Sequence, residues 1–220
     1  MSIDVFAICY NEEVLLPYFI KHYQSMGANI TIYDNYSTDN SVAIIKQAGC
    51  TYIPYDSNNQ IRDDLYLSIK NECWKKSKAD FVIVCDIDEF LEVDFDTSKY
   101  TIINTQGYDM LGIPPSRFGV KNDMYSKHIM FRPSEFKQIG YSFGCHKCAP
   151  EGNISGSKET ANLLHYKYIS EEHVYSRHLL YQSRLSDINK KYGWGIEYQT
   201  PEEEKIQTKF SELTIKSKII

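Results

Sequence analysis

Two aspartates, Asp86 and Asp88, follow directly after the apolar run 81–85. A short, uninterrupted apolar run is typical of a strand buried on both faces of a parallel sheet. In an extended backbone the two aspartates point the same way, whereas Ile87 points back into the core. Like charges held this close repel one another, and a hard divalent ion would relieve the repulsion while leaving positions open for substrate phosphates. The pattern therefore predicts a metal and phosphate site, although a solvated strand end explains the motif alone equally well.

The segments before this strand alternate between strand and helix patterns. Apolar runs at 3–9, 30–33 and 51–55 predict strands, and apolar residues at helical spacing lie between them. Short crossovers that contain helices imply parallel, right-handed units, and hence an α/β, Rossmann-like fold. The polar residues that follow these strands should meet at one edge of the sheet, where such folds bind ligands. They are Asn11 and Glu12, then Asp34 and Asn35, then Arg62, and finally Asp86 and Asp88.

Two of these residues allow a purely local interpretation. Asn11 reads as the N-cap of the helix that follows the first strand. Arg62 could reach a phosphate, or it could simply pair with the neighbouring Asp63 or Asp64. The sequence alone leaves both alternatives open.

The alternation loosens beyond residue 92. Residues 151–159 read as a polar loop, and a short strand at 163–168 contains His165. A charged helical pattern covers 171–191, and the end of the chain at 216–220 reads as frayed. These weaker patterns predict a mixed β region followed by C-terminal helices.

Composition narrows the class of protein. Hydrophobic residues make up 42% and charged residues 24% of the 220, as in a soluble globule, and the net charge of −5 gives no general attraction to nucleic acid. No apolar stretch is long enough to span a membrane, and the N-terminus does not read as a signal peptide. The scattered cysteines read as buried thiols of a reducing compartment, so we expect a cytoplasmic protein. No glycine-rich dinucleotide or P-loop motif follows any strand.

Three motifs, CYNEE at 9–13, IYDNYSTD at 32–39 and DIDEFL at 86–91, occur in order and with fitting gaps. Together they resemble the GT-A glycosyltransferases, and among them the family 2-like branch with an Asp-x-Asp-Glu-Phe ending, found in bacteria and in some large DNA viruses of algae. The resemblance is specific over residues 3–92 and thins beyond them. It implies one GT-A domain over 1–220, with a mixed, mostly parallel sheet flanked by helices. Its expected parts are a nucleotide-sugar half at 1–92, an acceptor-side half at 93–170 and a C-terminal helical segment at 171–220.

The resemblance also implies a ligand set. The donor would be a nucleotide-diphospho-sugar, most often a UDP-sugar, and the acceptor a glycan, a protein-linked glycan or another hydroxyl compound, with inversion at the anomeric carbon. Mn²⁺ or Mg²⁺ would be held by Asp86, Asp88 and the downstream His165; alternatively, His165 is satisfied by hydrogen bonds within its strand. The donor would contact residues at the strand ends, namely Cys9, Tyr10, Asn11, Glu12, Asp34, Asn35, Arg62, Asp86, Ile87 and Asp88.

The general base is left open between three residues. Glu89 lies beside the aspartate pair, whereas Glu151 and His146 fall in the region expected to cover the acceptor. Two other functions also stay open. A sugar-nucleotidyltransferase shares the architecture, but it would carry a glycine-rich loop near its N-terminus. A sugar-nucleotide or glycan-binding module that has lost catalysis is disfavoured by the intact aspartates. The chain could also be part of a longer protein.

Overall fold

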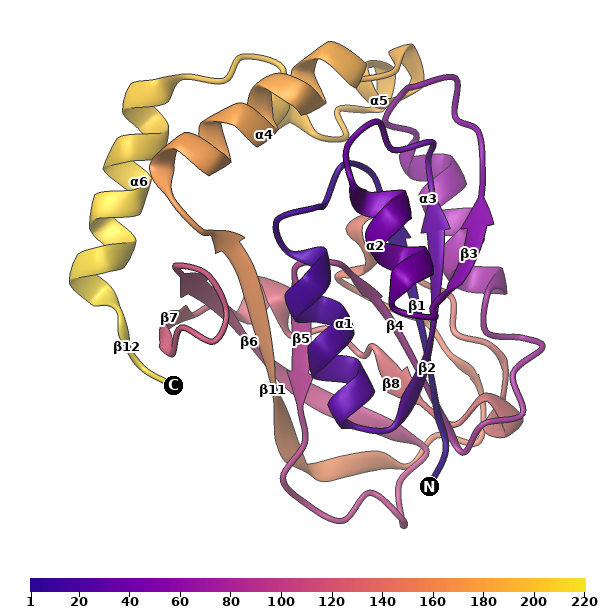
Figure 1. The fold of residues 1–220 in the computed structure, drawn as a ribbon. Coiled ribbons are helices and arrows are strands. Elements are labelled where there is room, and N and C mark those ends of the chain that lie inside the picture. The colour runs from indigo at the N-terminus through magenta and orange to yellow at the C-terminus, as the bar shows by residue number, and fades with distance from the viewer.

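The computed structural model describes all residues from 1 to 220. Its framework is a ten-stranded mixed sheet (Figure 1). The first four strands run parallel in the order β3-β2-β1-β4 and are β1 (Ile3–Cys9), β2 (Ala28–Asp34), β3 (Thr51–Pro54) and β4 (Phe81–Asp86). The strand–helix alternation expected from the sequence is confirmed, and the carboxyl ends of all four strands meet at one edge.

Strand β4 is buried on both faces, as its apolar run predicted. Phe81, Ile83 and Cys85 point into the larger hydrophobic cluster, whereas Val82 and Val84 point into a smaller one on the other face. Burying a large aliphatic or aromatic side chain stabilises a fold by about 1.5–3 kcal/mol. The strand that ends in Asp86 is therefore held in place by packing on both sides.

The second half of the sheet is longer than the sequence indicated. Strands β6 (Ile102–Leu111) and β11 (Gly156–Tyr168) run parallel to each other. The remaining strands are antiparallel to their neighbours: β5 (Glu89–Glu92), β7 (Phe118–Lys121), β8 (Met130–Phe131), and the separate pair β9 (Phe136–Gln138) and β10 (Glu151–Gly152). The loop expected at 151–159 is confined to residues 153–155, because exposed polar residues in β10 and at the start of β11 hide the strand pattern.

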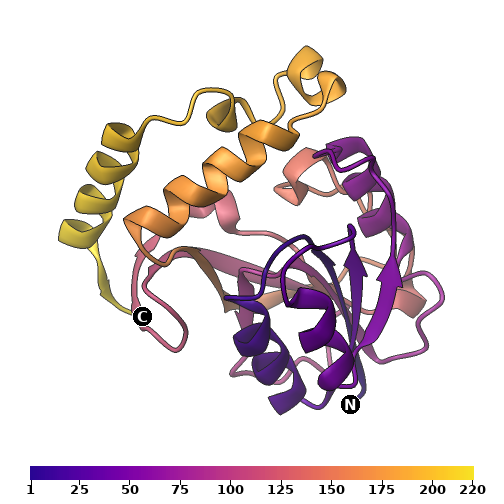
Figure 2. The same cartoon turned by 45° about the horizontal axis from the view of Figure 1, so that its top comes forward.

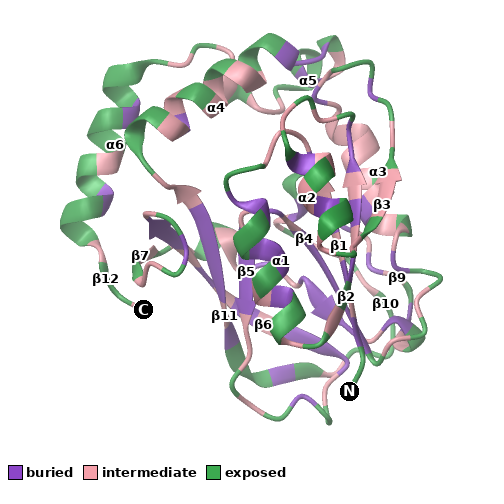
Figure 3. Cartoon of the chain, viewed as in Figure 1, coloured by how far each residue is buried: buried purple, intermediate pink, exposed green.

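Helices cover both faces of the parallel strands (Figure 1). Residues of α1 (Leu16–Ser25) and α2 (Ser41–Gln47) enter the larger hydrophobic cluster, whereas α3 (Asp63–Glu72) packs against the smaller one. Figure 3 shows buried strands between helices whose outer faces are exposed. This arrangement confirms the expected α/β fold. None of the helices combines the length and the apolar character that a membrane crossing requires.

The C-terminal part contains α4 (Glu171–Arg184), α5 (Asp187–Tyr192) and α6 (Glu203–Lys216). Figures 1 and 2 show α4 running across the end of the sheet at which β1 and β4 terminate. The helical pattern expected at 171–191 is confirmed but divided between α4 and α5, because Leu185 is extended and the Ser186 side chain caps a new helix. Short 3-10 turns connect the elements: η1 (Asp123–Tyr125), η2 (Pro133–Glu135), η3 (Phe143–Cys145) and η4 (Ile196–Tyr198).

Two other local expectations are wrong. The chain end is not frayed, because β12 (Lys218–Ile219) pairs with β7 and the Ile220 carbonyl accepts a hydrogen bond from Arg117. Asn11 does not cap α1, which begins at Leu16 without a side-chain cap. Instead, Asn11 adopts a left-handed backbone, and its Oδ1 accepts a 2.7 Å hydrogen bond from the Thr38 amide, so it ties the end of β1 to the loop before α2.

Candidate active site

A cavity of about 450 Å³ lies where β1 and β4 end, and its lining includes residues of α3 and α4. Asp86, Ile87 and Asp88 line it together with Tyr10 and Glu12, which follow β1. The convergence of polar strand ends that the sequence predicted is therefore present for β1 and β4. The cavity brings these side chains together in one place where chemistry can occur.

Asp86 is engaged by two buried lysines. Lys70 of α3 places its Nζ 2.6 Å from Oδ1 of Asp86, and Lys127 lies 3.7 Å from Oδ2. Lys127 also lies 2.5 Å from Oε1 of Glu89, whose Oε2 accepts a hydrogen bond from the Asp86 amide. Burial works to raise the pKa of Asp86, but the two ammonium groups outweigh it and hold that pKa below its ordinary value. Two acids and two lysines thus form a neutral group beside the cavity.

The second aspartate of the motif has a different partner. Asp88 Oδ2 lies 3.2 Å from Nε2 of His165, and Nδ1 of the same ring lies 3.1 Å from Oδ1 of Asp109. His165 and Asp109 are paired across β11 and β6, which explains how residues so far apart in sequence meet. Burial alone would lower the pKa of His165, but the two carboxylates raise it to about 9. The imidazole therefore lies between two acids and lines the cavity.

Helix α4 is fastened over the cavity by two arginines. Arg177 forms an ion pair with Glu12 and donates hydrogen bonds to the carbonyls of Tyr10 (3.3 Å) and Asn11 (2.8 Å). The guanidinium of Arg184 lies 3.1 Å from the centre of the Tyr10 ring. Burial raises the pKa of Glu12 to about 7, despite the opposing effect of Arg177. These contacts join the C-terminal helices to the end of β1.

The three candidates for the general base lie in different environments. His146 lines the cavity, and its Nδ1 hydrogen bonds to the Met124 carbonyl at 2.9 Å. Burial, followed by the charge of Lys127, lowers the pKa of His146, so the ring is neutral at pH 7. Glu89 is buried in its ion pair, and Glu151 is exposed on β10; neither lines the cavity.

A glycine makes room for His146. Gly144 has φ +67°, a value that favours glycine, and a Cβ there would lie 2.7 Å from the His146 ring. The ring can therefore occupy its place in the cavity wall only beside a residue without a side chain.

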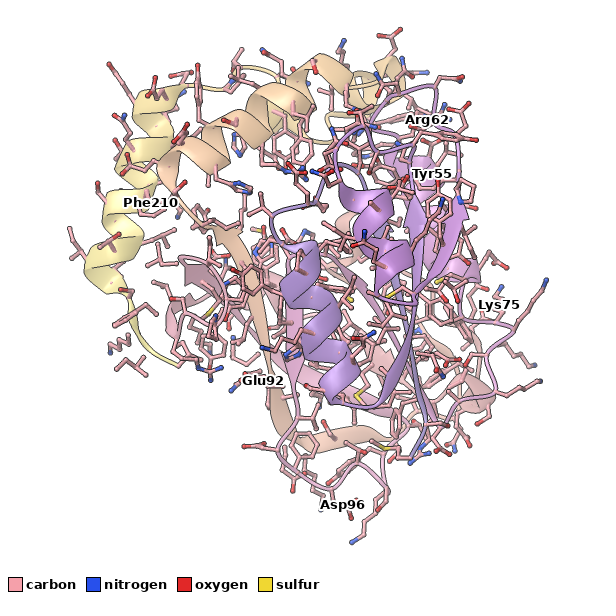
Figure 4. All side chains as sticks on the ribbon, viewed as in Figure 1. Tyr55, Arg62, Lys75, Glu92, Asp96 and Phe210 are labelled. Atoms are coloured by element: carbon pink, nitrogen blue, oxygen red, sulfur yellow. The ribbon has the colours of Figure 1, made fainter.

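The remaining donor candidates do not line the cavity; they are Cys9, Asn11, Asp34, Asn35 and Arg62. The side chain of Asp34 accepts hydrogen bonds from Ser37, and that of Asn35 donates to Ser57. Arg62 pairs with Asp64 at 2.6 Å, which is the local alternative that the sequence allowed, and Figure 4 labels it at the upper right of the molecule.

Several residues of the site were missed by reading the sequence. Lys70 lies three residues after Leu67 on one face of α3, and Asp109 lies between Tyr108 and Met110 near the end of β6, so each carried a weak signal as a charge next to apolar residues. Lys127 and Arg177 carried none, because their partners are far away in sequence.

The model of the glycosyl transferase family 2 matches residues 4–159, most of the chain. A search of curated proteins found no match. Among solved structures, residues 1–349 of S. aureus TarS are 15% identical, with 86% of this chain and 68% of that chain covered and a TM-score of 0.44.

Two other solved structures are similar over a smaller share of their own length. The mannosyltransferase PcManGT from Pyrobaculum calidifontis, in complex with GDP-Man and Mn²⁺, is 9% identical, with 83% of this chain and 61% of that chain covered and a TM-score of 0.47. Glucosyl-3-phosphoglycerate synthase from Mycobacterium tuberculosis, in complex with Mn²⁺, UDP and glucosyl-3-phosphoglycerate, is 12% identical, with 50% and 44% covered and a TM-score of 0.34. The chain thus spans less than two thirds of either protein. Placement in the Asp-x-Asp-Glu-Phe branch stays a prediction. Because the family model covers most of the sequence, the chain belongs to the glycosyl transferase family 2.

Proposed function

We propose that this protein transfers a sugar from a nucleotide-diphospho-sugar, most often a UDP-sugar, to a hydroxyl acceptor with inversion at the anomeric carbon. The observation that carries the proposal is the pair Asp88–His165 in the cavity where β1 and β4 end. Membership of the family supports the reaction class. We place the donor on the side formed by residues 1–92 and the acceptor on the side that contributes His146.

The residues present fit a divalent ion. A carboxylate oxygen and an imidazole nitrogen 3.2 Å apart can serve as two ligands, and the second imidazole nitrogen is already bound to a carboxylate, as in metal-binding histidines. No group of three or more histidine, cysteine or acidic side chains is arranged to hold a metal ion by itself. In our proposal Asp88 and His165 hold Mn²⁺ or Mg²⁺, and donor phosphates complete the ligand set. When bound, the ion would neutralise the charge that grows on the diphosphate.

We assign a different role to Asp86. Both of its oxygens face ammonium groups, so its charge is already compensated. A ribose hydroxyl, which can donate a hydrogen bond, is a better partner for this carboxylate than a second cation contact. Asp86 therefore belongs to the donor site rather than to the metal site.

His146 is the general base of the proposed mechanism. Its ring is neutral, and Nε2 makes no hydrogen bond within the protein, while Nδ1 donates to a carbonyl. The acceptor oxygen forms a bond to the anomeric carbon from the face opposite the diphosphate. The bond between that carbon and the phosphate oxygen breaks, and its electron pair leaves with the diphosphate. The hydroxyl proton passes to Nε2 of His146. Glu89 is held by Lys127, and Glu151 lies outside the cavity, so neither serves as base.

Turnover with a panel of nucleotide sugars, hydroxyl acceptors and Mn²⁺ or Mg²⁺ tests the proposal. We expect one UDP released per sugar transferred, and loss of this activity in Asp88→Asn. A specific donor should also stabilise the protein by about 2.7 kcal/mol at a concentration one hundred times its Kd. Release of pyrophosphate from a sugar phosphate and a nucleoside triphosphate would instead indicate a nucleotidyltransferase. Binding without turnover would indicate a module that has lost catalysis.

A further inference from the structure

Asp109 is a buried acid outside the cavity lining, and both of its oxygens are used. Oδ1 lies 3.1 Å from Nδ1 of His165, and Oδ2 accepts a 2.8 Å hydrogen bond from the Asn122 side chain. The residue is 4% exposed. Because an unpaired buried carboxylate is costly, this arrangement fixes Asp109 and, through it, one edge of the imidazole ring.

The His165 ring is fixed by a second contact. The Tyr125 ring stacks on it with centroids 3.9 Å apart and an angle of 28° between the planes. The strand pairing of His165 with Asp109 sets the position of the backbone as well. A rotated ring would lose both the stack and the hydrogen bond to Asp109. Nε2 is therefore held toward Asp88 and the cavity before any ligand arrives.

We propose that Asp109 is a positioning residue that makes the site prefer Mn²⁺ over Mg²⁺, an inference that rests on the proposed function. A carboxylate on Nδ1 raises the basicity of the other ring nitrogen and fixes its orientation. Both ions favour oxygen ligands, but Mn²⁺, a transition-metal ion, accepts an imidazole nitrogen more readily than Mg²⁺, which is a harder ion and dehydrates reluctantly. The strengthened nitrogen donor of His165 thus contributes more to the binding of Mn²⁺ than to that of Mg²⁺.

The test measures metal affinity directly. Mn²⁺ binding to the full chain in the presence of UDP is followed by electron paramagnetic resonance, and Mg²⁺ affinity is obtained by competition. For Asp109→Ala we expect Mn²⁺ affinity to fall about 10–100-fold, with Mg²⁺ affinity changed much less. Asp109→Asn keeps an oxygen that can accept from Nδ1 but lacks the charge, so its loss should be intermediate. Asp123→Asn changes an exposed acid on η1 that is paired with Lys121; it is the matched control and should change neither affinity.

A spectroscopic readout separates metal binding from folding. Electron spin echo modulation from a ¹⁴N nucleus should be present for Mn²⁺ in the wild type and absent in His165→Gln. Mn²⁺ bound without this modulation would overturn the inference while leaving an ion at Asp88, and hence the proposed function, intact. An unchanged ratio of Mn²⁺ to Mg²⁺ affinity in a folded Asp109→Asn or Asp109→Ala variant would also overturn it. Absence of any Mn²⁺ binding with UDP would remove both the inference and the metal part of the proposed function.

Discussion

Replacing Lys127 with methionine tests whether the two lysines compensate the charges of the two acids, Asp86 and Glu89. The Lys127 side chain is 4% exposed and its partner Glu89 is 1% exposed, with 2.5 Å between the charged atoms. Removing one member of a buried pair leaves an uncompensated charge and costs about 3–5 kcal/mol. For a chain of this size each kcal/mol lowers Tm by about 2–4 °C, so we expect a fall of about 6–20 °C.

Urea unfolding of three variants provides the measurement. Lys127→Met combined with Glu89→Gln should recover most of the loss, because neither charge then remains. Lys205→Met removes an exposed pair with Glu202 and should change the free energy of unfolding by less than about 0.5 kcal/mol. If Lys127→Met costs no more than this control, Glu89 carries no charge that needs compensation. The argument that the lysines compensate the charge of Asp86, and that Asp86 therefore does not bind the metal ion, would then lose its support.

Three further predictions concern residues around the cavity. His165 has a pKa raised from 6.5 to about 9, so its stabilising effect is fully present below about pH 6.5 and is lost as pH rises through 9. This effect amounts to about 3 kcal/mol in the free energy of unfolding. Urea unfolding of chelator-treated protein should therefore show wild type to be more stable relative to His165→Gln at pH 6 than at pH 9.5, and a stability difference between the two proteins that does not change with pH would contradict the prediction. Arg177→Met should cost about 1–3 kcal/mol and speed amide exchange in α4, whereas unchanged exchange would mean that Arg177 does not fasten the helix. Gly144→Ala should displace the His146 ring and lower kcat while the Kd for UDP stays unchanged; equal kcat would exclude His146 as the base.

The parts of the fold that follow from local patterns could be predicted. The apolar run that ends at Asp86 had to be buried on both faces, and the helical spacing between strands implied parallel pairing. Those two inferences place the ends of β1 and β4 together without any knowledge of distant contacts. Boundaries failed where polar residues mask a strand, as at the start of β11, or where one serine restarts a helix, as at Ser186.

The partners of the site residues could not be predicted in the same way. Asp109 meets His165 only because β6 and β11 pair in one register, and Arg177 meets Glu12 only because α4 crosses the sheet. Polar side chains at strand ends also form hydrogen bonds with backbone and hydroxyl groups of the loop that follows the strand. Asp34, for example, accepts from the Ser37 amide and hydroxyl, so its position after β2 says little about a ligand.

The charges around the cavity predict how the binding of Mn²⁺ depends on the binding of UDP. The charges of Lys70 and Lys127 balance those of Asp86 and Glu89. In the metal-free protein the protonated His165 lies between two carboxylates, so this second group carries a net charge of only minus one. An ion must displace the imidazole proton and finds two protein ligands, so we expect weak Mn²⁺ binding without nucleotide.

Donor phosphates bring both the missing ligands and the missing negative charge. UDP should therefore strengthen Mn²⁺ binding, and by linkage Mn²⁺ must strengthen UDP binding by the same factor. Titration calorimetry of each ligand with and without the other measures the two factors, which must agree within error. Mn²⁺ that binds equally tightly in the absence of UDP would mean that the protein supplies a complete ligand set, contrary to the proposed site in which Asp88 and His165 are the two protein ligands.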